Sequence, residues 1–380
     1  MTHKKNILLF QRLIPHYRVA LFKKLHEKLG IVVCHSRARK GASLQEQQEL
    51  GFPNEVLPRV YFGKAPTSMV QFTGRVLRKH KPSIVITEFS LKYLTFWWLF
   101  FLRFFYGYKL VVWTHGVKSK EKLKPFTTFR SKIQLWVYRK ADAVILYAEP
   151  EKEMLAQYVD KPEKLFVANN TLDTEKLNEI YNRLAASGRD HVKEKLGYSN
   201  KYNLVFIGRL LWRKRMDMLF ESFEKISKKL DVGLHIIGSG PEEEMVRSFA
   251  GKHQNVHYHG PINNLELSSK HLFASDLMVM PGYVGLSAVH SMAMGCPVAT
   301  CRQGDEGPYH GPEVAYIKNG ENGVLSDYSA EAFTEALLKL LPDATLLHKM
   351  SAEARKTITA EAGIDRFVSG FEEAVGYVGD

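Results

Sequence analysis

Short runs of apolar residues alternate along the chain with longer segments in which apolar residues recur at helical spacing. Strands of this length separated by helices are typical of β-α-β units, whose strands form a parallel sheet. The pattern occurs twice and therefore predicts two doubly wound α/β domains. The predicted strands are Ile7–Phe10, Ile31–Cys34, Ile84–Thr87, Leu110–Trp113, Ala143–Leu146 and Leu165–Val167, followed after a break by Leu204–Ile207, Leu234–Ile237, Val256–Tyr258, Leu277–Met280 and Val298–Thr300.

The boundary between the two domains is predicted near 169–173, a turn-rich stretch that follows the last strand of the first series. We expect residues 1–170 to form an N-terminal Rossmann-like domain and residues 171–359 a C-terminal one. The last helix, about 360–380, could pack back on either domain, the N-terminal one included. Doubly wound sheets bind ligands at the carboxyl ends of their strands. Two such domains facing one another would therefore place the site in a central cleft.

The aromatic-rich stretch 94–105 has two interpretations. It is too short to cross a bilayer and contains Arg103. It could be a crossover helix that is buried on many faces. It could instead be an interfacial helix whose aromatic side chains and neighbouring cations contact a membrane surface. The apolar run 7–10 is too short for a signal peptide, so we expect a cytoplasmic protein.

Composition and charge narrow the class of protein. The chain has 380 residues, 45% of them hydrophobic and 24% charged, which is ordinary for a globular protein. Its three cysteines are sparse and lack metal-ligand spacing, so neither a disulfide framework nor a zinc site is expected.

The formal net charge is +13, and the positive excess lies in the first 160 residues. A basic surface attracts nucleic acid, acidic lipid or phosphorylated substrates. No nucleic-acid-binding motif accompanies the charge, so no nucleic-acid partner is expected. The alternative is that these lysines only solvate helix faces.

Three segments at predicted strand ends carry candidate chemistry. Gly208 ends a strand, and Arg209 and Lys214 beyond it could neutralise a diphosphate, unless they form a basic loop over solvent. The loop and short helix in 281–297 offer free backbone N–H groups at the helix start, which suit an anion. His115, directly after a strand, could bind a sugar hydroxyl or transfer a proton, although a lone histidine is more often structural.

In their order and spacing these segments resemble glycosyltransferase family 4, which has the GT-B fold. The resemblance covers most of the chain and is strongest from Asn170 to Leu325. The matching segments are Asn170–Asp173 ("NGvD"), Gly208–Leu210 with Lys214 and Asp217 ("GRL…KGxD"), Leu234–Pro241 ("vGdGp"), Val256–Gly260 ("V.f.G"), Gly285–Val298 ("GL…MA.G.PV") and Asn319–Gly323 ("nG.nG").

The resemblance implies a retaining hexosyltransferase that needs no metal or other cofactor and uses a nucleotide-sugar, a UDP- or GDP-sugar above all. It implies that Arg209 and Lys214 stabilise the departing diphosphate, and that His115 lies beside the transferred sugar. The donor-binding residues that we expect are Gly208, Gly285, Leu286, Ser287, His290 and Glu313.

Two departures from the family pattern concern this donor site. The family has two glutamates around the Gly-Leu segment, whereas this chain has Gly282 and Tyr283 near the first position and His290 at the second. His290 could still contact a ribose, or it could be an ordinary hydrogen-bonded helix residue. Glu306 or Glu313 could supply the missing first carboxylate.

The first loop resembles the "PxYR" segment of bacterial members that build surface polysaccharides. This resemblance implies that His16, Tyr17 and Arg18 face an acceptor saccharide carried on a lipid diphosphate. Arg18 could instead cap or line the first helix, and Glu88 is a further acceptor candidate. We therefore expect a protein peripheral to the inner face of the cell membrane, contacting anionic lipid, in polysaccharide, O-antigen, capsule or lipopolysaccharide biosynthesis.

Two other functions fit the same fold. One is a catalytically disabled GT-B binding subunit, which the presence of Arg209, Lys214 and His115 disfavours. The other is a nucleotide-sugar epimerase, which the order of the motifs disfavours.

Overall fold

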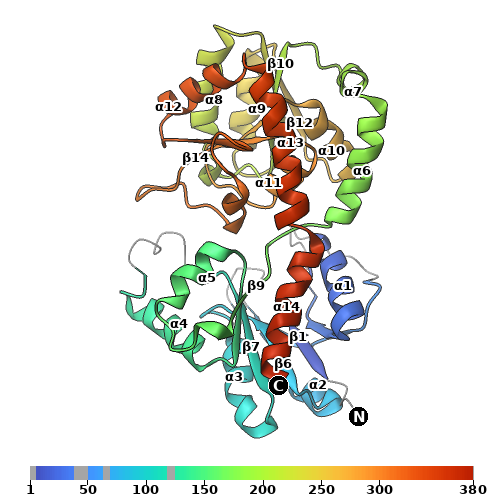
Figure 1. Ribbon diagram of the computed structural model, residues 1–380, viewed down its shortest axis with the longest axis vertical. Helices are drawn as coiled ribbons and strands as arrows, with labels where there is room; N and C mark the ends of the chain where they lie inside the picture. The colour runs from blue at the N-terminus through green and yellow to red at the C-terminus, as the bar shows by residue number, and fades with distance from the viewer. Residues whose placement is uncertain (1–5, 38–49, 63–68, 118–124, 380) are drawn as a thin grey trace. The chain divides into compact units, whose positions relative to one another are not determined.

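The computed structural model describes residues 6–37, 50–62, 69–117 and 125–379. It divides into two compact units, which we call unit 1 (residues 1–173 and 364–380) and unit 2 (residues 174–363). Each unit is a parallel sheet with helices packed on it (Figure 1). The two α/β sheets predicted from the hydrophobic pattern are thereby confirmed.

Unit 1 contains a seven-stranded sheet in the order β3-β2-β1-β6-β7-β8-β9, in which all pairs are parallel. The strand order reverses between β1 and β6, and doubly wound sheets bind ligands at such a point. The strands are β1 (Ile7–Phe10), β2 (Val32–His35), β3 (Asn54–Val56), β6 (Ile84–Glu88), β7 (Lys109–Thr114), β8 (Ala143–Leu146) and β9 (Leu165–Val167), and a separate hairpin pairs β4 (Arg59–Tyr61) with β5 (Met69–Gln71).

Two apolar clusters bury the two faces of this sheet. Ile7 and Leu9 of β1 lie in the cluster with α1 (Val19–Leu29) and α14 (Ile364–Gly379). Leu8 and Phe10 lie in the other cluster, because successive side chains of a strand point to opposite faces. The helices that contribute to this second cluster are α2 (Gly74–His80), α3 (Leu94–Tyr106), α4 (Phe129–Lys140) and α5 (Glu149–Ala156).

Unit 2 contains a six-stranded parallel sheet in the order β12-β11-β10-β13-β14-β15. The strands are β10 (Tyr202–Ile207), β11 (Val232–Ile237), β12 (Val256–Gly260), β13 (Leu277–Val279), β14 (Val298–Cys301) and β15 (Gly323–Ser326). The helices are α6 (Thr174–Ser187), α7 (Arg189–Lys195), α8 (Met216–Ser227), α9 (Glu243–Lys252), α10 (Leu265–Ala274), α11 (Ser287–Ala293), α12 (Ala330–Leu340) and α13 (Ala344–Glu361).

The predicted strands all appear, with ends that differ by one or two residues. The pattern missed β3, the β4–β5 hairpin and β15. The first three of these strands have three residues each, and most of their side chains are partly or fully exposed. Strands that are this short and this exposed to solvent lack the continuous apolar run on which the prediction depends.

Helix α3 is buried on one face only. Thr95, Phe96, Leu99 and Phe100 face the core, whereas Phe104 and Phe105 are 70% and 84% exposed. The expectation of a crossover helix covered on many faces is therefore wrong, because the neighbouring elements reach only one side of α3. No helix among the described residues is both long and apolar enough to span a bilayer.

The last helix, α14, packs on β8 and β9 of unit 1. The contact is close at Gly370, where an added Cβ would lie 2.1 Å from the carbonyl oxygen of Val167. Aromatic residues of α14 continue the contact, since Phe367 and Phe371 pack edge-on against Trp113. Glycine at this position therefore sets how closely the chain's last helix approaches the sheet.

We expect Gly370→Ala to lower the free energy of unfolding of unit 1 by about 1–3 kcal/mol, because the methyl group forces α14 away from β9. Gly376→Ala in the same helix is the matched control, since nothing lies within 4 Å of its added Cβ. The control is expected to gain up to about 1 kcal/mol from helix propensity. Urea unfolding measures both, and equal effects of the two substitutions would contradict the close-packing argument.

Candidate functional site

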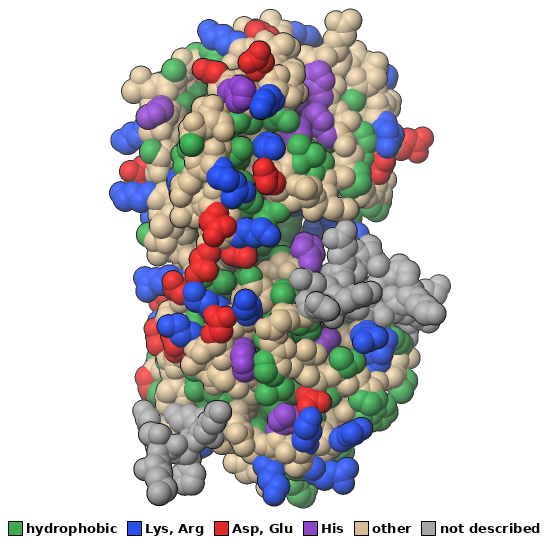
Figure 2. Space-filling model, turned by 90° about the vertical axis from the view of Figure 1, so that its right-hand side faces the viewer, with side chains coloured by type: hydrophobic (Ala, Val, Ile, Leu, Met, Phe, Trp, Pro, Cys, Tyr) green, Lys and Arg blue, Asp and Glu red, His purple; other side chains and the backbone are tan. Residues whose placement is uncertain are grey.

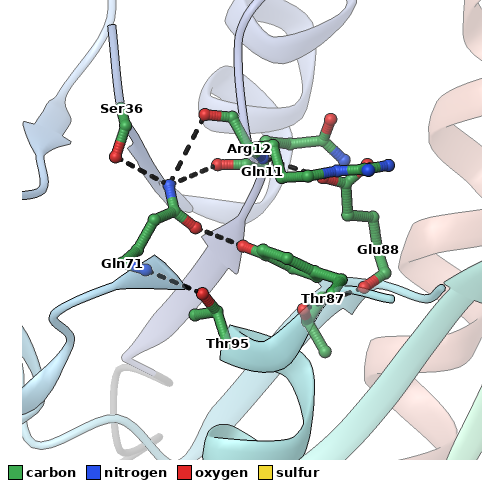
Figure 3. A network of polar contacts seen from close by, with 8 residues as sticks. Gln11, Arg12, Ser36, Gln71, Thr87, Glu88 and Thr95 are labelled. Atoms are coloured by element: carbon green, nitrogen blue, oxygen red, sulfur yellow. Dashed lines mark hydrogen bonds and ion pairs between the residues drawn. The ribbon is translucent and has the colours of Figure 1, made fainter. Parts of the chain in front are cut away.

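Charged side chains gather at the carboxyl ends of adjacent strands in unit 1. Arg12 follows β1, and Glu88 is the last residue of β6. The carboxylate of Glu88 accepts from Arg12 N at 2.8 Å, from Nε at 2.7 Å and from Nη2 at 3.3 Å (Figure 3). Glu88, an expected acceptor residue, is thus fixed at the point where the strand order of the sheet reverses. Any ligand that binds its carboxylate must do so beside the hydrogen bonds from Arg12.

Gln71 holds the backbone that carries Arg12. This buried amide donates from Nε2 to the carbonyl of Gln11 and to Ser36 Oγ, both at 3.0 Å. Its Oε1 accepts from the Tyr93 hydroxyl (Figure 3). The sequence analysis missed Gln71 because a single glutamine in a three-residue strand carries no recognisable pattern.

Arg18 is a buried cation close to the same strand ends. Its side chain is 8% exposed, and its Nη2 donates to Tyr147 Oη at 3.1 Å and to Asn170 Oδ1 at 3.2 Å. The guanidinium lies 4.5 Å from the centre of the Trp113 ring. Its buried Nη1 has no acceptor among the described residues. Arg18 is the N-cap residue of α1, but its side chain makes no capping hydrogen bond there.

The other expected residues of unit 1 lie around Arg18. His115 is exposed and its ring is 4.3 Å from that of Tyr147. His16, Tyr17 and Arg18 form the 3-10 helix η1 (His16–Arg18), and Arg18 lies 6.0 Å from the Tyr17 ring. The structure thus brings the expected acceptor residues and His115 to one end of the sheet.

In unit 2, Lys214 lies buried beneath the loop that follows β13. It ends the 3-10 helix η4 (Trp212–Lys214) and is 6% exposed. Its Nζ donates to the Tyr283 carbonyl at 2.6 Å and contacts Met280 Sδ at 3.1 Å. Arg209, after Gly208, is exposed, and no hydrogen bond or ion pair of its side chain is found among the described residues.

Burial lowers the pKa of Lys214 from its ordinary 10.5 to about 7. Repulsion from Arg213 acts in the same direction, and the carboxylate of Glu313 opposes both. Lys214 therefore changes charge close to neutral pH, whereas an exposed lysine does not.

The backbone leaves no space for a side chain at 282, near the position where the family carries its first glutamate. Gly282 N donates to the Lys214 carbonyl at 3.2 Å, and Tyr283 N donates to the Arg213 carbonyl at 2.8 Å. A Cβ on Gly282 would lie 2.2 Å from the Arg213 carbonyl oxygen. The glycine is therefore required by the close approach of the two loops.

Of the two candidate carboxylates, Glu313 lies beside this loop and Glu306 is exposed. Glu313 is buried in η5 (Pro312–Tyr316). An added Cβ on Gly311 would lie 2.3 Å from Glu313 Oε2 and 3.0 Å from Tyr283 Oη. The carboxylate of Glu313 and the hydroxyl of Tyr283 therefore both lie close to Gly311.

His310 joins the two loops and was missed by the sequence analysis. Its Nδ1 accepts from Val284 N at 3.1 Å and its Nε2 donates to the Cys301 carbonyl at 2.8 Å. Gly311 N in turn donates to the Val284 carbonyl at 2.8 Å. These bonds fix the backbone directly before Gly285.

The remaining expected donor residues lie on or before α11. Gly285 and Leu286 are half-buried and precede Ser287, the first residue of this helix, which no side chain caps. His290 is buried, and its Nε2 bonds Ser269 Oγ at 2.8 Å. Burial lowers the pKa of His290 to about 4, so the imidazole is neutral at neutral pH.

Two parallel-sheet units, each with charged and aromatic groups at the carboxyl ends of its strands, define the GT-B class of fold. The chain belongs to the group 1 and family 4 glycosyltransferases. The family model "Glycosyl transferases group 1" matches residues 201–343. The model "Glycosyltransferase Family 4" matches residues 31–176.

Individual proteins agree with this family. An uncharacterized glycosyltransferase of Methanocaldococcus jannaschii is 26% identical over 67% of this chain and 64% of its own length. The chain matches less than half of the length of the next two curated relatives. The Anabaena protein HepE, solved with UDP, has a TM-score of 0.71 at 15% identity, covering 98% of this chain and 99% of HepE. WaaG, a glycosyltransferase involved in lipopolysaccharide biosynthesis, has a TM-score of 0.66 at 16% identity, covering 98% and 100%.

Among the described residues, no group of three or more His, Cys, Asp and Glu is placed to hold a metal ion. The expectation that transfer needs no metal is independent of this observation and stays a prediction.

The pKa of Lys214 predicts a pH dependence of nucleotide-diphosphate affinity. A bound diphosphate favours the charged lysine, so binding at pH above 7 takes up a proton. Affinity for UDP or GDP should then fall as pH rises, by about tenfold per unit between pH 7.5 and 8.5. Isothermal titration in Hepes and in Tris measures the affinity and the proton uptake together. Lys214→Gln should bind weakly and without this slope, and a wild-type affinity that is constant over the range would contradict the argument.

Proposed function

We propose that this protein is a retaining, metal-independent glycosyltransferase that moves a hexosyl group from a UDP- or GDP-sugar to a lipid-linked saccharide. The observation that carries the proposal is the buried Lys214, joined to the Gly-Leu loop through Tyr283, in a chain that belongs to the glycosyltransferases. HepE, which shares the fold, binds UDP. The products would serve polysaccharide, O-antigen, capsule or lipopolysaccharide assembly, as the name of WaaG suggests by analogy.

In the proposed reaction the bond from the sugar C1 to the diphosphate breaks. A bond from C1 to an acceptor hydroxyl forms on the same face, and the hydroxyl proton passes to the departing phosphate. Arg209 and Lys214 stabilise the negative charge on the leaving group. His115 contacts the transferred sugar. Gly208, Gly285, Leu286, Ser287 and His290 complete the donor site.

Glu313 supports the donor sugar in place of the family's first glutamate. It is the buried carboxylate next to Tyr283, and it acts on the charge of Lys214. In a transfer assay, Glu313→Gln is expected to raise the donor KM or lower kcat. Unchanged kinetics would contradict the role of Glu313 in supporting the donor sugar.

The acceptor carries an anionic group that binds Arg18. A buried guanidinium with a free donor and only neutral partners lacks the counter-charge that buried ions require. The phosphates of a lipid diphosphate supply that charge and match a planar fork of N–H donors. His16 and Tyr17 on the same 3-10 helix, and the fixed carboxylate of Glu88, border this position.

The exposed face of α3 contacts the membrane that holds the acceptor lipid. Phe101, Phe104 and Phe105 lie on this face. Arg103 of the same helix lies 4.8 Å from the centre of the Phe104 ring, and Figure 2 shows further Lys and Arg side chains among hydrophobic ones on one face of unit 1. Aromatic side chains flanked by cations bind an anionic lipid surface at its interface. The attachment would be peripheral, at the inner face of the cell membrane.

A transfer assay with UDP- and GDP-sugars and a polyprenyl-diphosphate-linked saccharide tests the function. The expected product keeps the anomeric configuration of the donor sugar, as read by NMR. Arg18→Met should raise the acceptor KM by about ten- to a hundredfold, with the donor KM unchanged, because charge-assisted hydrogen bonds are lost. Arg75→Met, which removes an exposed arginine of unit 1, is the matched control.

The outcomes separate the alternatives. Nucleotide-sugar binding without transfer indicates a disabled GT-B subunit, and isomerisation of the donor without acceptor indicates an epimerase. An inverted product overturns the retaining mechanism. An unchanged acceptor KM in Arg18→Met overturns only the phosphate role of Arg18.

Vesicle co-sedimentation tests the membrane contact. Phe101→Ser/Phe105→Ser should lower partitioning onto vesicles of phosphatidylglycerol and phosphatidylcholine by about tenfold or more, because two aromatic side chains no longer insert. The matched control is Trp212→Ser, which removes an exposed aromatic residue of unit 2. Equal binding of wild type and the double variant would exclude α3 as the contact.

A further inference from the structure

A hollow lies at the amino end of the unit 2 sheet. Lys201 and Tyr202 line it where β10 begins, and Asp276 lines it just before β13. The donor-site residues follow the carboxyl ends of these same strands, so the hollow lies at the opposite edge of the sheet. Its volume of about 300 Å³ suits a small ligand.

Cations outnumber carboxylates around this hollow. Arg189 and Lys201 line it beside the imidazole of His348, and Asp276 is the acid that faces them. The Asp276 carboxylate is already occupied, since it accepts from Asn203 N at 2.7 Å and pairs with Arg189 Nη2 at 3.2 Å. Lys193 adds a further positive charge 3.5 Å from the same carboxylate. The positive charge of the hollow therefore exceeds what its own acid balances.

Arg189 retains an unused hydrogen-bond donor. Its Nη2 donates to the Ser275 carbonyl and pairs with Asp276. Its buried Nε has no acceptor among the described residues. A guanidinium in this condition gains charge-assisted bonds when an anion arrives, with only a small adjustment of the side chain.

Most of the remaining wall is apolar or aromatic, with Ser351 as its polar member. Leu341 directly follows α12, Leu347 lies on α13, and the ring of Tyr202 lies 5.2 Å from Lys201 Nζ. Leu347 and Tyr202 are partly exposed, so an anion with a small organic body would cover them, whereas a bare inorganic ion would leave them in water.

We propose that this hollow binds a small phosphate monoester, with the phosphate held by Arg189, Lys201 and His348 and its organic part resting on Leu347 and Tyr202. This site is separate from the proposed donor site, and the proposal of one site does not depend on the proposal of the other.

Isothermal titration with glycerol 3-phosphate tests the proposal, with glycerol as the uncharged probe. Wild-type protein should bind glycerol 3-phosphate saturably and glycerol not at all. Lys201→Gln should weaken binding by about fivefold or more, because one exposed contact to the phosphate is lost. Lys229→Gln, which removes another exposed lysine of unit 2, should bind like wild type.

Lys214→Gln separates this site from the donor site and should also bind glycerol 3-phosphate like wild type. Absence of saturable heat, or equal affinity in Lys201→Gln and wild type, overturns the proposal. Loss of binding in Lys214→Gln overturns it too, because the phosphate would then lie in the donor site. None of these results bears on sugar transfer, which is measured separately.

Discussion

The candidate donor site depends on one contact, the pairing of residues 282–283 with the turn at 213–214. Two backbone hydrogen bonds join these loops, and Lys214 adds a third through its side chain to the Tyr283 carbonyl. The contact places a cation from the end of β10 directly beneath the loop that leads into α11. It also requires a glycine at 282, since any Cβ there meets the carbonyl of Arg213. The charge, the loop path and the missing glutamate thus have one structural cause.

Lys214 and Arg18, two of the buried cations among the described residues, are tolerated for different physical reasons. Lys214 can release its proton, and burial brings its pKa to about 7, so the free protein need not hold a full charge there. Arg18 cannot be deprotonated at any ordinary pH. It is held instead by neutral oxygens and by the face of Trp113. Both arrangements stabilise a buried positive charge less than a carboxylate partner would. An anionic ligand would therefore stabilise both residues.

The sequence was most informative where a pattern repeats and least informative where one contact decides. Periodic apolar runs predicted the strands of both sheets, because a strand buried on both faces must be apolar throughout. The motifs located Gly208, Lys214 and Gly285, since their spacing follows strand ends. Nothing in the sequence separated Glu306 from Glu313, because both lie in the segment between β14 and β15 and only tertiary packing buries one. Gln71 and His310 act through single long-range bonds and leave no local signal.

The packing around Gly282 bears on whether the absent glutamate means lost activity. The backbone of Arg213 and Lys214 fills the space into which a Cβ at 282 would project, and His310 and Gly311 hold the loop from its other side. A buried carboxylate, Glu313, lies beside the rearranged loop. A buried lysine and a buried acid beside one loop support the proposal of an active enzyme over that of a disabled subunit, because a subunit without chemistry gains nothing from burying either charge.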